Sequence, residues 1–256
     1  MTNPLLRKLS NFVRLSEDQQ QALETLTSRP KSYAGQSDIV CEGDPTSGVY
    51  LILDGWAYRY KVGDDGRRQI MSYFVPGDIC DQRIFVLNRM DHNIGTLTQA
   101  SIAKVSKEAI IDLTDRHPQI ARAFWWSTLI DEAVAREWLM NTGRRNAVQR
   151  VGHLMCEMFV RLRAIGLVDG QSFQFPLTQI QLADTLGLST VHLNRSLKVL
   201  RRRGLIEWAR GPLTILELDK LASASMFNSS YLHLEGEVAP VSGGLTEPAA
   251  RNAAVT

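Results

Sequence analysis

The sequence predicts an α+β protein with an antiparallel, β-rich N-terminal half and a helical C-terminal half. Short runs of β-forming residues alternate with Gly, Asp, Pro and Asn turn signals from about residue 31 to residue 106, which is typical of an antiparallel sandwich or roll. At His117-Pro118 the apolar spacing changes to a helical period. Strands do not alternate with helices in the β-rich part, so a parallel βαβ sheet is not expected. Two short helices, 4–12 and 16–26, precede the strands.

The helical half contains two long predicted helices. Apolar residues mark successive turns from Pro118 to about Asn141, and Gly143 is a natural end for this helix. A second apolar stripe runs from about residue 145 to 165. The end of the chain is rich in small and polar residues without a period, which predicts disorder. We therefore expect a β-rich domain, a long helix, a C-terminal domain and a disordered tail: residues 1–116, 117–142, 143–230 and 231–256.

Composition excludes several classes of protein. The chain has 256 residues, of which 44% are hydrophobic and 22% charged, so two ordinary globular domains fit its length. An apolar run of the roughly 18 residues that span a bilayer is missing, and polar residues interrupt the start where a signal peptide would be apolar. We expect a cytoplasmic protein without a membrane partner. Three cysteines with no CxxC spacing argue against a disulfide framework or a metal site.

The charge is unevenly distributed along the chain. The formal net charge is +2, but residues 143–212 alone carry +7, whereas residues 1–142 carry −2 and residues 213–256 carry −3. A compact basic segment is expected of a nucleic-acid-binding module, and equally of a solvated helix face. Charge alone leaves these two interpretations open.

Residues 178–203 have the spacing of a helix-turn-helix motif. Thr178 is a plausible N-cap, Ala183 is small enough for a second helix to cross closely, Gly187 permits a left-handed turn, and Ser189 caps the next helix. The apolar stripe of the second helix then consists of Leu193, Leu197 and Leu200. Ser196 stands where this motif usually has an apolar residue, which predicts a locally looser core.

The opposite face of the second helix carries side chains suited to phosphates and base edges. Two β-like runs, 206–209 and 213–216, flank Arg210-Gly211-Pro212 and resemble a hairpin wing. The agreement of motif, wing and charge predicts binding to double-stranded DNA. The predicted contact residues are Thr178, Gln179, Ser189, Thr190, Val191, His192, Asn194, Arg195 and Lys198.

Residues 178–206 resemble the winged helix-turn-helix of the Crp/Fnr superfamily of transcriptional regulators. The Glu42-Gly43-Asp44, Asp54-Gly55 and Pro76-Gly77-Asp78 turns are similar to those of that family's cyclic-nucleotide-binding-like jelly roll, and together the resemblance covers about residues 10–225. It implies a sensor roll, a homodimer joined along the long helix, a palindromic operator, and contact with RNA polymerase.

The resemblance is weaker where family members bind cyclic nucleotides. They carry a Gly-Glu-Leu segment after the Gly-Asp turn and later an Arg-Ser or Arg-Thr pair for the phosphate, whereas this chain has Gln82 near the Glu position and Asp91-His92 near the pair. A carboxylate facing a phosphate is repulsive, so cyclic AMP is not expected to be the effector. Arg83 or Arg89 could replace the missing cation. The residues of the predicted effector pocket are Tyr73, Asp81, Gln82, Arg83, Asp91 and His92.

The cofactor remains unknown from the sequence. The N-terminal cysteine cluster that holds an iron–sulfur cluster in Fnr-type members is missing, so that cofactor is not expected. Haem held by His92, His117 or Cys80, thiol sensing by Cys80 or Cys41, and a constitutive DNA binder whose roll is only a dimer scaffold remain as alternatives. No catalytic residue is predicted, because the sequence carries no P-loop, GxSxG or HExxH motif.

Overall fold

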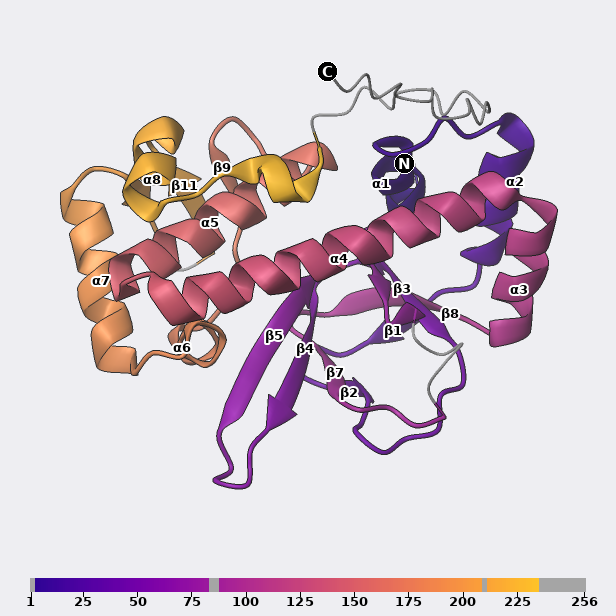
Figure 1. Ribbon diagram of the computed structural model, residues 1–256, viewed down its shortest axis with the longest axis horizontal. Coiled ribbons are helices and arrows are strands. Elements are labelled where there is room, and N and C mark those ends of the chain that lie inside the picture. The colour runs from indigo at the N-terminus through magenta and orange to yellow at the C-terminus, as the bar shows by residue number, and fades with distance from the viewer. Residues whose placement is uncertain (1–2, 83–87, 209–210, 235–256) are drawn as a thin grey trace, which may run out of the picture.

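A computed structural model, which describes residues 3–82, 88–208 and 211–234, confirms the predicted α+β fold. Figure 1 shows the β-rich roll at one end, the C-terminal helices at the other, and one long helix crossing between them. The helices are α1 (Pro4–Ser10), α2 (Glu17–Leu26), α3 (Lys107–Arg116), α4 (Pro118–Arg144), α5 (Ala147–Ala164), α6 (Gln179–Leu186), α7 (Thr190–Arg202), α8 (Leu218–Ser225) and the 3₁₀ turn η2 (Ser229–Leu232).

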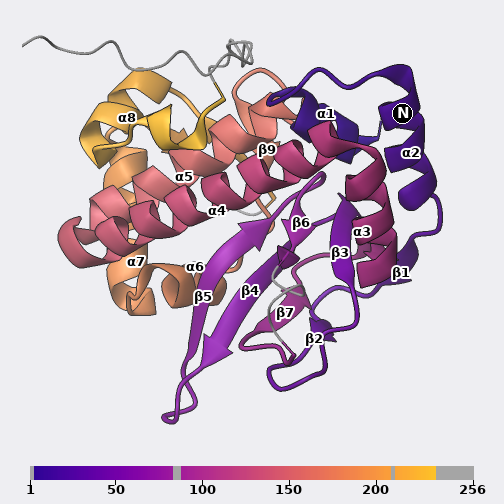
Figure 2. The ribbon, with the colours of Figure 1, turned by 45° about the vertical axis from the view of Figure 1, so that its right-hand side comes forward.

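The roll consists of two four-stranded antiparallel sheets, in the orders β1-β8-β3-β6 and β2-β7-β4-β5. Its strands are β1 (Lys31–Tyr33), β2 (Asp38–Val40), β3 (Val49–Asp54), β4 (Ala57–Val62), β5 (Arg68–Phe74), β6 (Ile79–Cys80), β7 (Asn93–Thr96) and β8 (Ala100–Val105). A compact cluster that includes Ile52, Phe74 and Ile94 fills the roll interior. The β4–β5 hairpin extends beyond the rest of the roll (Figure 2).

Helix α4 connects the two ends of the molecule. Its 27 residues correspond to a length of about 40 Å. One side of the helix is buried, and that side includes Ile120, Phe124, Val134 and Trp138, as the helical spacing predicts. The observed bounds extend two residues beyond the predicted end at 142, because Gly143 lies within the last turn instead of ending it.

The C-terminal domain adds three short strands to helices α5 to α8. Strands β9 (Ser172–Gln174), β10 (Ile206–Glu207) and β11 (Pro212–Ile215) form a sheet in the order β10-β11-β9, so the predicted wing is present and gains a third strand that the sequence analysis missed. Helices α5 and α8 cross closely at Gly152, where an added Cβ would lie 2.0 Å from Ser225 Oγ.

The disordered tail was predicted to start at residue 231, but residues 231–234 are ordered and pack against the C-terminal domain. Leu232 is buried, and Tyr231 packs in a ring stack on His153 of α5, because this short turn closes the apolar side of α5. The remainder of the predicted tail, residues 235–256, lies outside the described residues.

The C-terminal turn η2 is held in place by the buried carboxylate of Glu157. Glu157 of α5 accepts hydrogen bonds from Tyr231 Oη at 2.7 Å and from Trp138 Nε1 at 3.0 and 3.1 Å, and it lies 3.5 Å from Arg161 Nη1. Burial raises the pKa of Glu157 in spite of these donors. Because a buried carboxylate that loses a donor is costly, each of these hydrogen bonds contributes to stability.

We expect Tyr231→Phe to lower the free energy of unfolding by about 1–3 kcal/mol, since it removes a donor to a buried carboxylate without opening a cavity. Urea denaturation measures the change. Tyr33→Phe, at a half-buried tyrosine for which the structure gives no hydrogen bond, is the matched control and should be neutral. Equal stability of the two variants would contradict this role for Tyr231.

Candidate DNA-binding surface and roll cavity

Helices α6 and α7 form the predicted helix-turn-helix. The Thr178 hydroxyl accepts from Gln181 N–H at the start of α6, and Gly187 ends this helix in the left-handed region with a φ of 59°. Ser189 then caps α7, because its hydroxyl accepts from His192 N–H at 3.3 Å. These local signals fix the two helix ends and hence the turn between them.

The inner side of α7 is well packed. Leu193, Leu197 and Leu200 are fully buried, as predicted. Ser196 is also buried, and its hydroxyl donates to His192 O at 2.9 Å within the helix. Because its polar atom is satisfied, the structure gives a reason why a serine is tolerated at this core position.

The outer side of α7 is exposed and basic. No acidic residue occurs between Thr190 and Arg202. Among the predicted contact residues, those with exposed side chains are Thr178, Gln179, Ser189, Thr190, Val191, His192, Arg195 and Lys198. Asn194 is half-buried, and its amide donates to Gln179 Oε1 and to Thr190 O, each at 3.0 Å. Asn194 and Gln179 thus lie side by side on the surface that spans both helices.

The wing packs against the end of α7. Arg201 donates through Nη2 to Trp208 O, and Trp208 in turn packs edge-on against Phe175 with ring centroids 5.4 Å apart. Strands β10 and β11 pair in antiparallel register through Ile206 and Ile215. Arg210, at the predicted tip of the wing, lies outside the described residues.

Strand β5 of the roll contacts α6 directly. Arg68 donates through Nε and Nη2 to Asp184 Oδ2 at 2.9 and 2.8 Å, and Gln69 Nε2 donates to Thr185 O at 3.1 Å. The hydroxyls of Tyr73 and Thr185 lie 2.5 Å apart. We call these five residues the β5–α6 contact; it joins the roll to the first helix of the helix-turn-helix.

The Pro76-Gly77-Asp78 turn is tied to two helices. Asp78 Oδ1 lies 2.6 Å from Lys8 Nζ of α1, and Asp78 Oδ2 lies 2.9 Å from Arg161 Nη2 of α5. Burial alone would raise the pKa of Asp78, but the two cations and the hydrogen bond from Val75 N–H outweigh it and hold this pKa below its ordinary value. Folding therefore favours the ionised carboxylate.

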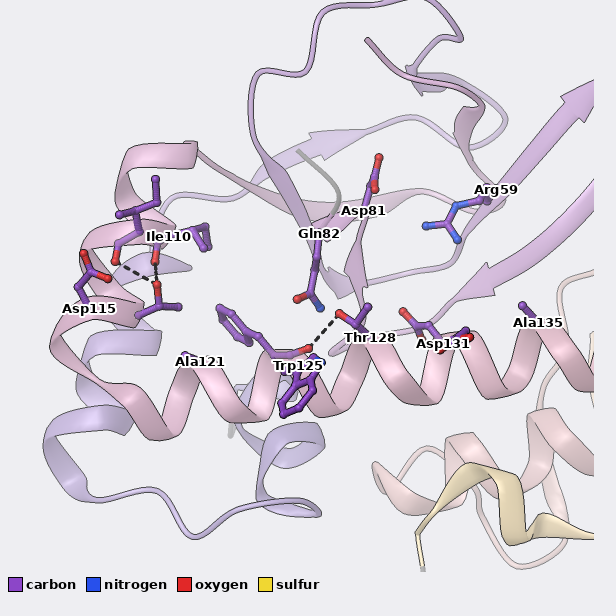
Figure 3. Close-up of a pocket in the computed structure, with 14 residues that line it drawn as sticks. Arg59, Asp81, Gln82, Ile110, Asp115, Ala121, Trp125, Thr128, Asp131 and Ala135 are labelled. Atoms are coloured by element: carbon purple, nitrogen blue, oxygen red, sulfur yellow. Dashed lines mark hydrogen bonds between the residues drawn. The ribbon is translucent and has the colours of Figure 1, made fainter. Parts of the chain in front are cut away.

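A cavity of about 730 Å³ lies between the roll, α3 and α4 (Figure 3). The residues that line it come from β4, from the segment after β6, and from the facing sides of the two helices. They are Arg59, Asp81, Gln82, Ile110, Ile111, Thr114, Asp115, Ala121, Phe124, Trp125, Thr128, Asp131, Glu132 and Ala135.

Two family descriptions match the two ends of the chain. Residues 30–117 match the cyclic nucleotide-binding domain, and residues 149–224 match the Crp-like helix-turn-helix domain. The chain belongs to the Crp/Fnr superfamily of transcriptional regulators. The sequence is similar to the nitrogen fixation regulation protein FixK of Bradyrhizobium diazoefficiens, with 27% identity over 197 residues that cover 75% of this chain and 81% of that protein.

Other members of the superfamily match over similar lengths. The transcriptional activator protein FnrL of Cereibacter sphaeroides is 24% identical over 69% of this chain and 71% of its own. The solved structure of FixK2 from Bradyrhizobium japonicum has a TM-score of 0.68 at 23% identity and covers 76% of this chain and 96% of that one. The c-di-GMP-responsive regulator CLP of Xanthomonas campestris has a TM-score of 0.63 at 18% identity, and the match covers 79% of this chain and 100% of that one. These structures show the fold.

In this Crp/Fnr chain, the structure separates the predicted effector residues. Asp81 and Gln82 line the cavity. Tyr73 does not line it; it is fully buried in the β5–α6 contact, because its strand turns that side chain toward α6. Arg83 lies outside the described residues.

Asp91 and His92 support the cavity wall instead of lining it. His92 is buried, accepts from Arg59 Nε at 3.1 Å, and lies 2.6 Å from Asp91 Oδ1 through Nδ1. Burial and the neighbouring Arg59 lower the pKa of His92. Arg59 and Asp131, which line the cavity, were missed; only the strand alternation of β4 and the helical spacing of α4 could have placed them on inward-facing sides.

The three cysteines lie in surroundings that raise their pKa values. Burial raises the pKa of the Cys80 and Cys156 thiols, and partial desolvation with nearby Asp38 and Asp44 raises that of Cys41. These shifts disfavour the reactive thiolate. Within the described ranges, no group of three or more His, Cys, Asp or Glu side chains could hold a metal ion. None of the helices described there is long and apolar enough to cross a bilayer.

Protonation of Asp78 should destabilise the fold. Because its folded-state pKa is depressed, the stabilisation is present above the ordinary aspartate value of about 4 and is lost as the pH falls through the folded-state pKa. We expect the stability difference between the wild type and Asp78→Asn to be constant near neutral pH and to shrink below about pH 4. Urea titrations across this range measure this difference. Asp219→Asn, at an exposed position of α8, serves as the control. A difference that stays constant into acid would contradict the assignment.

Proposed function

We propose that this regulator binds double-stranded DNA as a homodimer, with α7 of each subunit in the major groove of a palindromic operator. The observation that carries the proposal is the capped α7, whose exposed face is free of acidic residues and lies beside the wing in the most basic segment of the chain. A helix presented in this way fits the major groove of B-DNA.

Each predicted contact residue has a proposed role. Arg195 is suited to a guanine, Asn194 to an adenine or a phosphate, and Val191 with the Thr190 methyl group to a thymine methyl. The residues proposed to hold phosphates or to position the motif on the DNA backbone are Thr178, Gln179, Ser189, His192 and Lys198. Because Asn194 is hydrogen-bonded to Gln179 and to Thr190 O, reading a base with its amide requires at least one of these bonds to be exchanged.

The exposed side of α4 supports the homodimer. Trp125 is 65% exposed and Leu139 is 76% exposed, and Trp126, Leu129 and Met140 add further exposed apolar surface along the same helix. A monomer rarely leaves such surface uncovered along a long helix. Two copies of α4 packed about a two-fold axis would cover it and would space two α7 helices for a palindromic site.

The proposed effector site is the cavity between the roll and α4, and cyclic AMP is not the proposed effector. The β5–α6 contact offers a direct route from the roll to the helix-turn-helix, since β5 pairs with β4, which carries Arg59 of the cavity. Contact with RNA polymerase and a cytoplasmic location complete the proposal; the first rests on the superfamily resemblance and the second on the composition of the sequence. A constitutive DNA binder is the second candidate, favoured by the direct bonds that already join roll and α6.

Selection from a random duplex library tests the DNA proposal. The purified full chain is mixed with the library at moderate salt, and the retained duplexes are sequenced. Enrichment of an inverted repeat with half-sites about one helical turn apart supports a dimeric DNA binder. If only unrelated sequences are retained, with and without cell extract as a source of effector, the proposal fails. Equal enrichment under both conditions favours the constitutive candidate.

Arg195→Ala is expected to cost about 1–3 kcal/mol of operator affinity and to relax the preference at one position of each half-site, because a bidentate base contact is lost. Repeating the selection with this variant measures both effects. Arg29→Ala removes another exposed arginine, just after α2 and far in the sequence from α7, and should leave the affinity unchanged. An unaltered sequence preference in Arg195→Ala removes Arg195 from the base-reading set.

Leu139→Glu is expected to shift the dimer to monomer, since a carboxylate within the proposed α4 seam would be buried without a partner. Sedimentation velocity at several concentrations measures the shift. Val62→Glu places the same change at the β4–β5 hairpin, where Val62 is 49% exposed, and should preserve the dimer. A dimer that survives Leu139→Glu contradicts this seam.

A further inference from the structure

The cavity between the roll and α4 has a polar end and an apolar end. Figure 3 shows Arg59, Gln82 and Asp131 directed toward the same region beside α4, whereas Ile110 and Ala121 lie toward the opposite end. A cavity of about 730 Å³ is large enough for a small organic molecule. The chemistry of these two ends indicates what such a molecule carries.

Two groups at the polar end are hydrogen-bond donors with unused capacity. Arg59 is fixed by the hydrogen bond from its Nε to His92 and by the Phe74 ring, whose centroid lies 5.1 Å from the Arg59 Cζ. The bond to His92 is the only hydrogen bond that the described residues give Arg59. Both Nη groups therefore remain available. Gln82 Nε2 is buried without a hydrogen-bond partner. A buried amide donor without an acceptor is costly, so a ligand acceptor at this position would stabilise it.

Asp131 supplies the opposite charge. It projects from α4 toward the cavity, and no residue in the described ranges donates a hydrogen bond to it. Burial raises its pKa, although Lys8, Arg161 and Arg59 oppose this. The unused guanidinium of Arg59 and the carboxylate of Asp131 thus form a pair of opposite charges that do not bond to one another.

The other acidic side chains of the lining differ from Asp131 in their surroundings. Glu132 lies 2.7 Å from Arg136, and Asp81 also makes contacts elsewhere. Asp115 lies at the exposed end of α3. Asp131 is consequently the carboxylate best placed to take a ligand cation at the polar end.

The hydroxyls of the lining are already committed to helix backbone. Thr114 Oγ1 donates to Ile110 O at 2.9 Å, and Thr128 Oγ1 donates to Phe124 O at 3.1 Å. The wall toward α3 also includes the apolar residues Ile110, Ile111, Ala121, Phe124 and Trp125, with the carboxylate of Asp115 at its exposed edge. This end therefore offers apolar contact and few partners for the ring nitrogens and hydroxyls of a nucleotide.

We propose that the cavity binds an α-amino acid with an apolar side chain. Its carboxylate accepts from Arg59 and Gln82, its ammonium group donates to Asp131, and its side chain packs against Ile110 and Phe124. A zwitterion satisfies both charged groups of the site, whereas a monoanion gives Asp131 no hydrogen-bond donor and a monocation gives the Nη groups of Arg59 no acceptor. The inference rests on the proposed function, because it assigns a ligand to the proposed effector site.

Calorimetry on the full-length protein with L-phenylalanine as the probe tests the ligand class. Phenylacetate lacks the ammonium group, phenethylamine lacks the carboxylate and glycine lacks the side chain. Each is expected to bind at least about tenfold more weakly than phenylalanine, because one charge-assisted hydrogen bond or the apolar contact is lost. Equal affinity for phenylalanine and phenylacetate, or no binding of phenylalanine at millimolar concentration, overturns the proposal.

Two variants test the residues. Asp131→Asn should lower the affinity for phenylalanine at least about tenfold and leave the affinity for phenylacetate unchanged. Gln82→Leu should lower the affinity for both ligands. Asp219→Asn, at an exposed position of α8, is the matched control and should bind phenylalanine as the wild type does. Thermal unfolding without ligand identifies any variant that is misfolded. If Gln82→Leu is misfolded, Gln82→Glu replaces it and should also lower the affinity for phenylalanine and for phenylacetate. Unchanged phenylalanine affinity in folded Asp131→Asn overturns the assignment.

The library selection separates this inference from the proposed function. An inverted repeat enriched equally with and without phenylalanine leaves the DNA-binding proposal standing while removing the amino acid as its effector. Binding of phenylalanine to the monomeric Leu139→Glu variant alone would mean that the partner subunit fills the cavity in the dimer, which also overturns the inference. Tight phenylalanine binding with no DNA enrichment under any condition supports the ligand site and contradicts the proposed function.

Discussion

The guanidinium of Arg161, a side chain that is only 14% exposed, lies where the roll, the long helix and the C-terminal domain meet. It donates to Asp78 Oδ2 and to Tyr73 O, each at 2.9 Å, and it lies 3.5 Å from Glu157 Oε1. A buried cation is stable only when such acceptors surround it. Because these acceptors come from β5, the following turn and α5, the position of Arg161 fixes the roll against the first helix of the C-terminal domain.

The aromatic residues around this cation continue the connection. Tyr73 packs edge-on against Trp138 with ring centroids 5.9 Å apart, and the Trp138 indole donates to Glu157. Tyr73 also reaches Thr185 of α6. The larger hydrophobic cluster runs without interruption from α1 through α4 and α5 to α7, so the two domains that the families define share one core.

Local sequence signals predicted the helix-turn-helix well. The N-caps Thr178 and Ser189 and the left-handed Gly187 act on residues three or four positions away, and their pattern is readable without tertiary structure. The cavity was predicted less well, because Arg59 and Asp131 are 72 positions apart in the sequence. Only the packing of α4 on the roll brings them together.

The C-terminal turn shows the same limitation. Tyr231 and Leu232 stand in a segment whose composition favours disorder, and their burial depends on a carboxylate and an apolar groove of α5 that a one-dimensional pattern does not contain. The third wing strand, β9, was missed because a strand of three residues gives almost no periodicity.

The way in which α5 is enclosed also limits how the chain can be divided. A fragment that starts at residue 143 would keep Glu157 and Arg161 but lose the indole of Trp138 and the carboxylate of Asp78. Such a fragment would have to hydrate or neutralise these charges before its helices could pack. Helix α7 packs on α5, so any rearrangement that moves these two helices together away from the roll must break the Asp78–Arg161 ion pair.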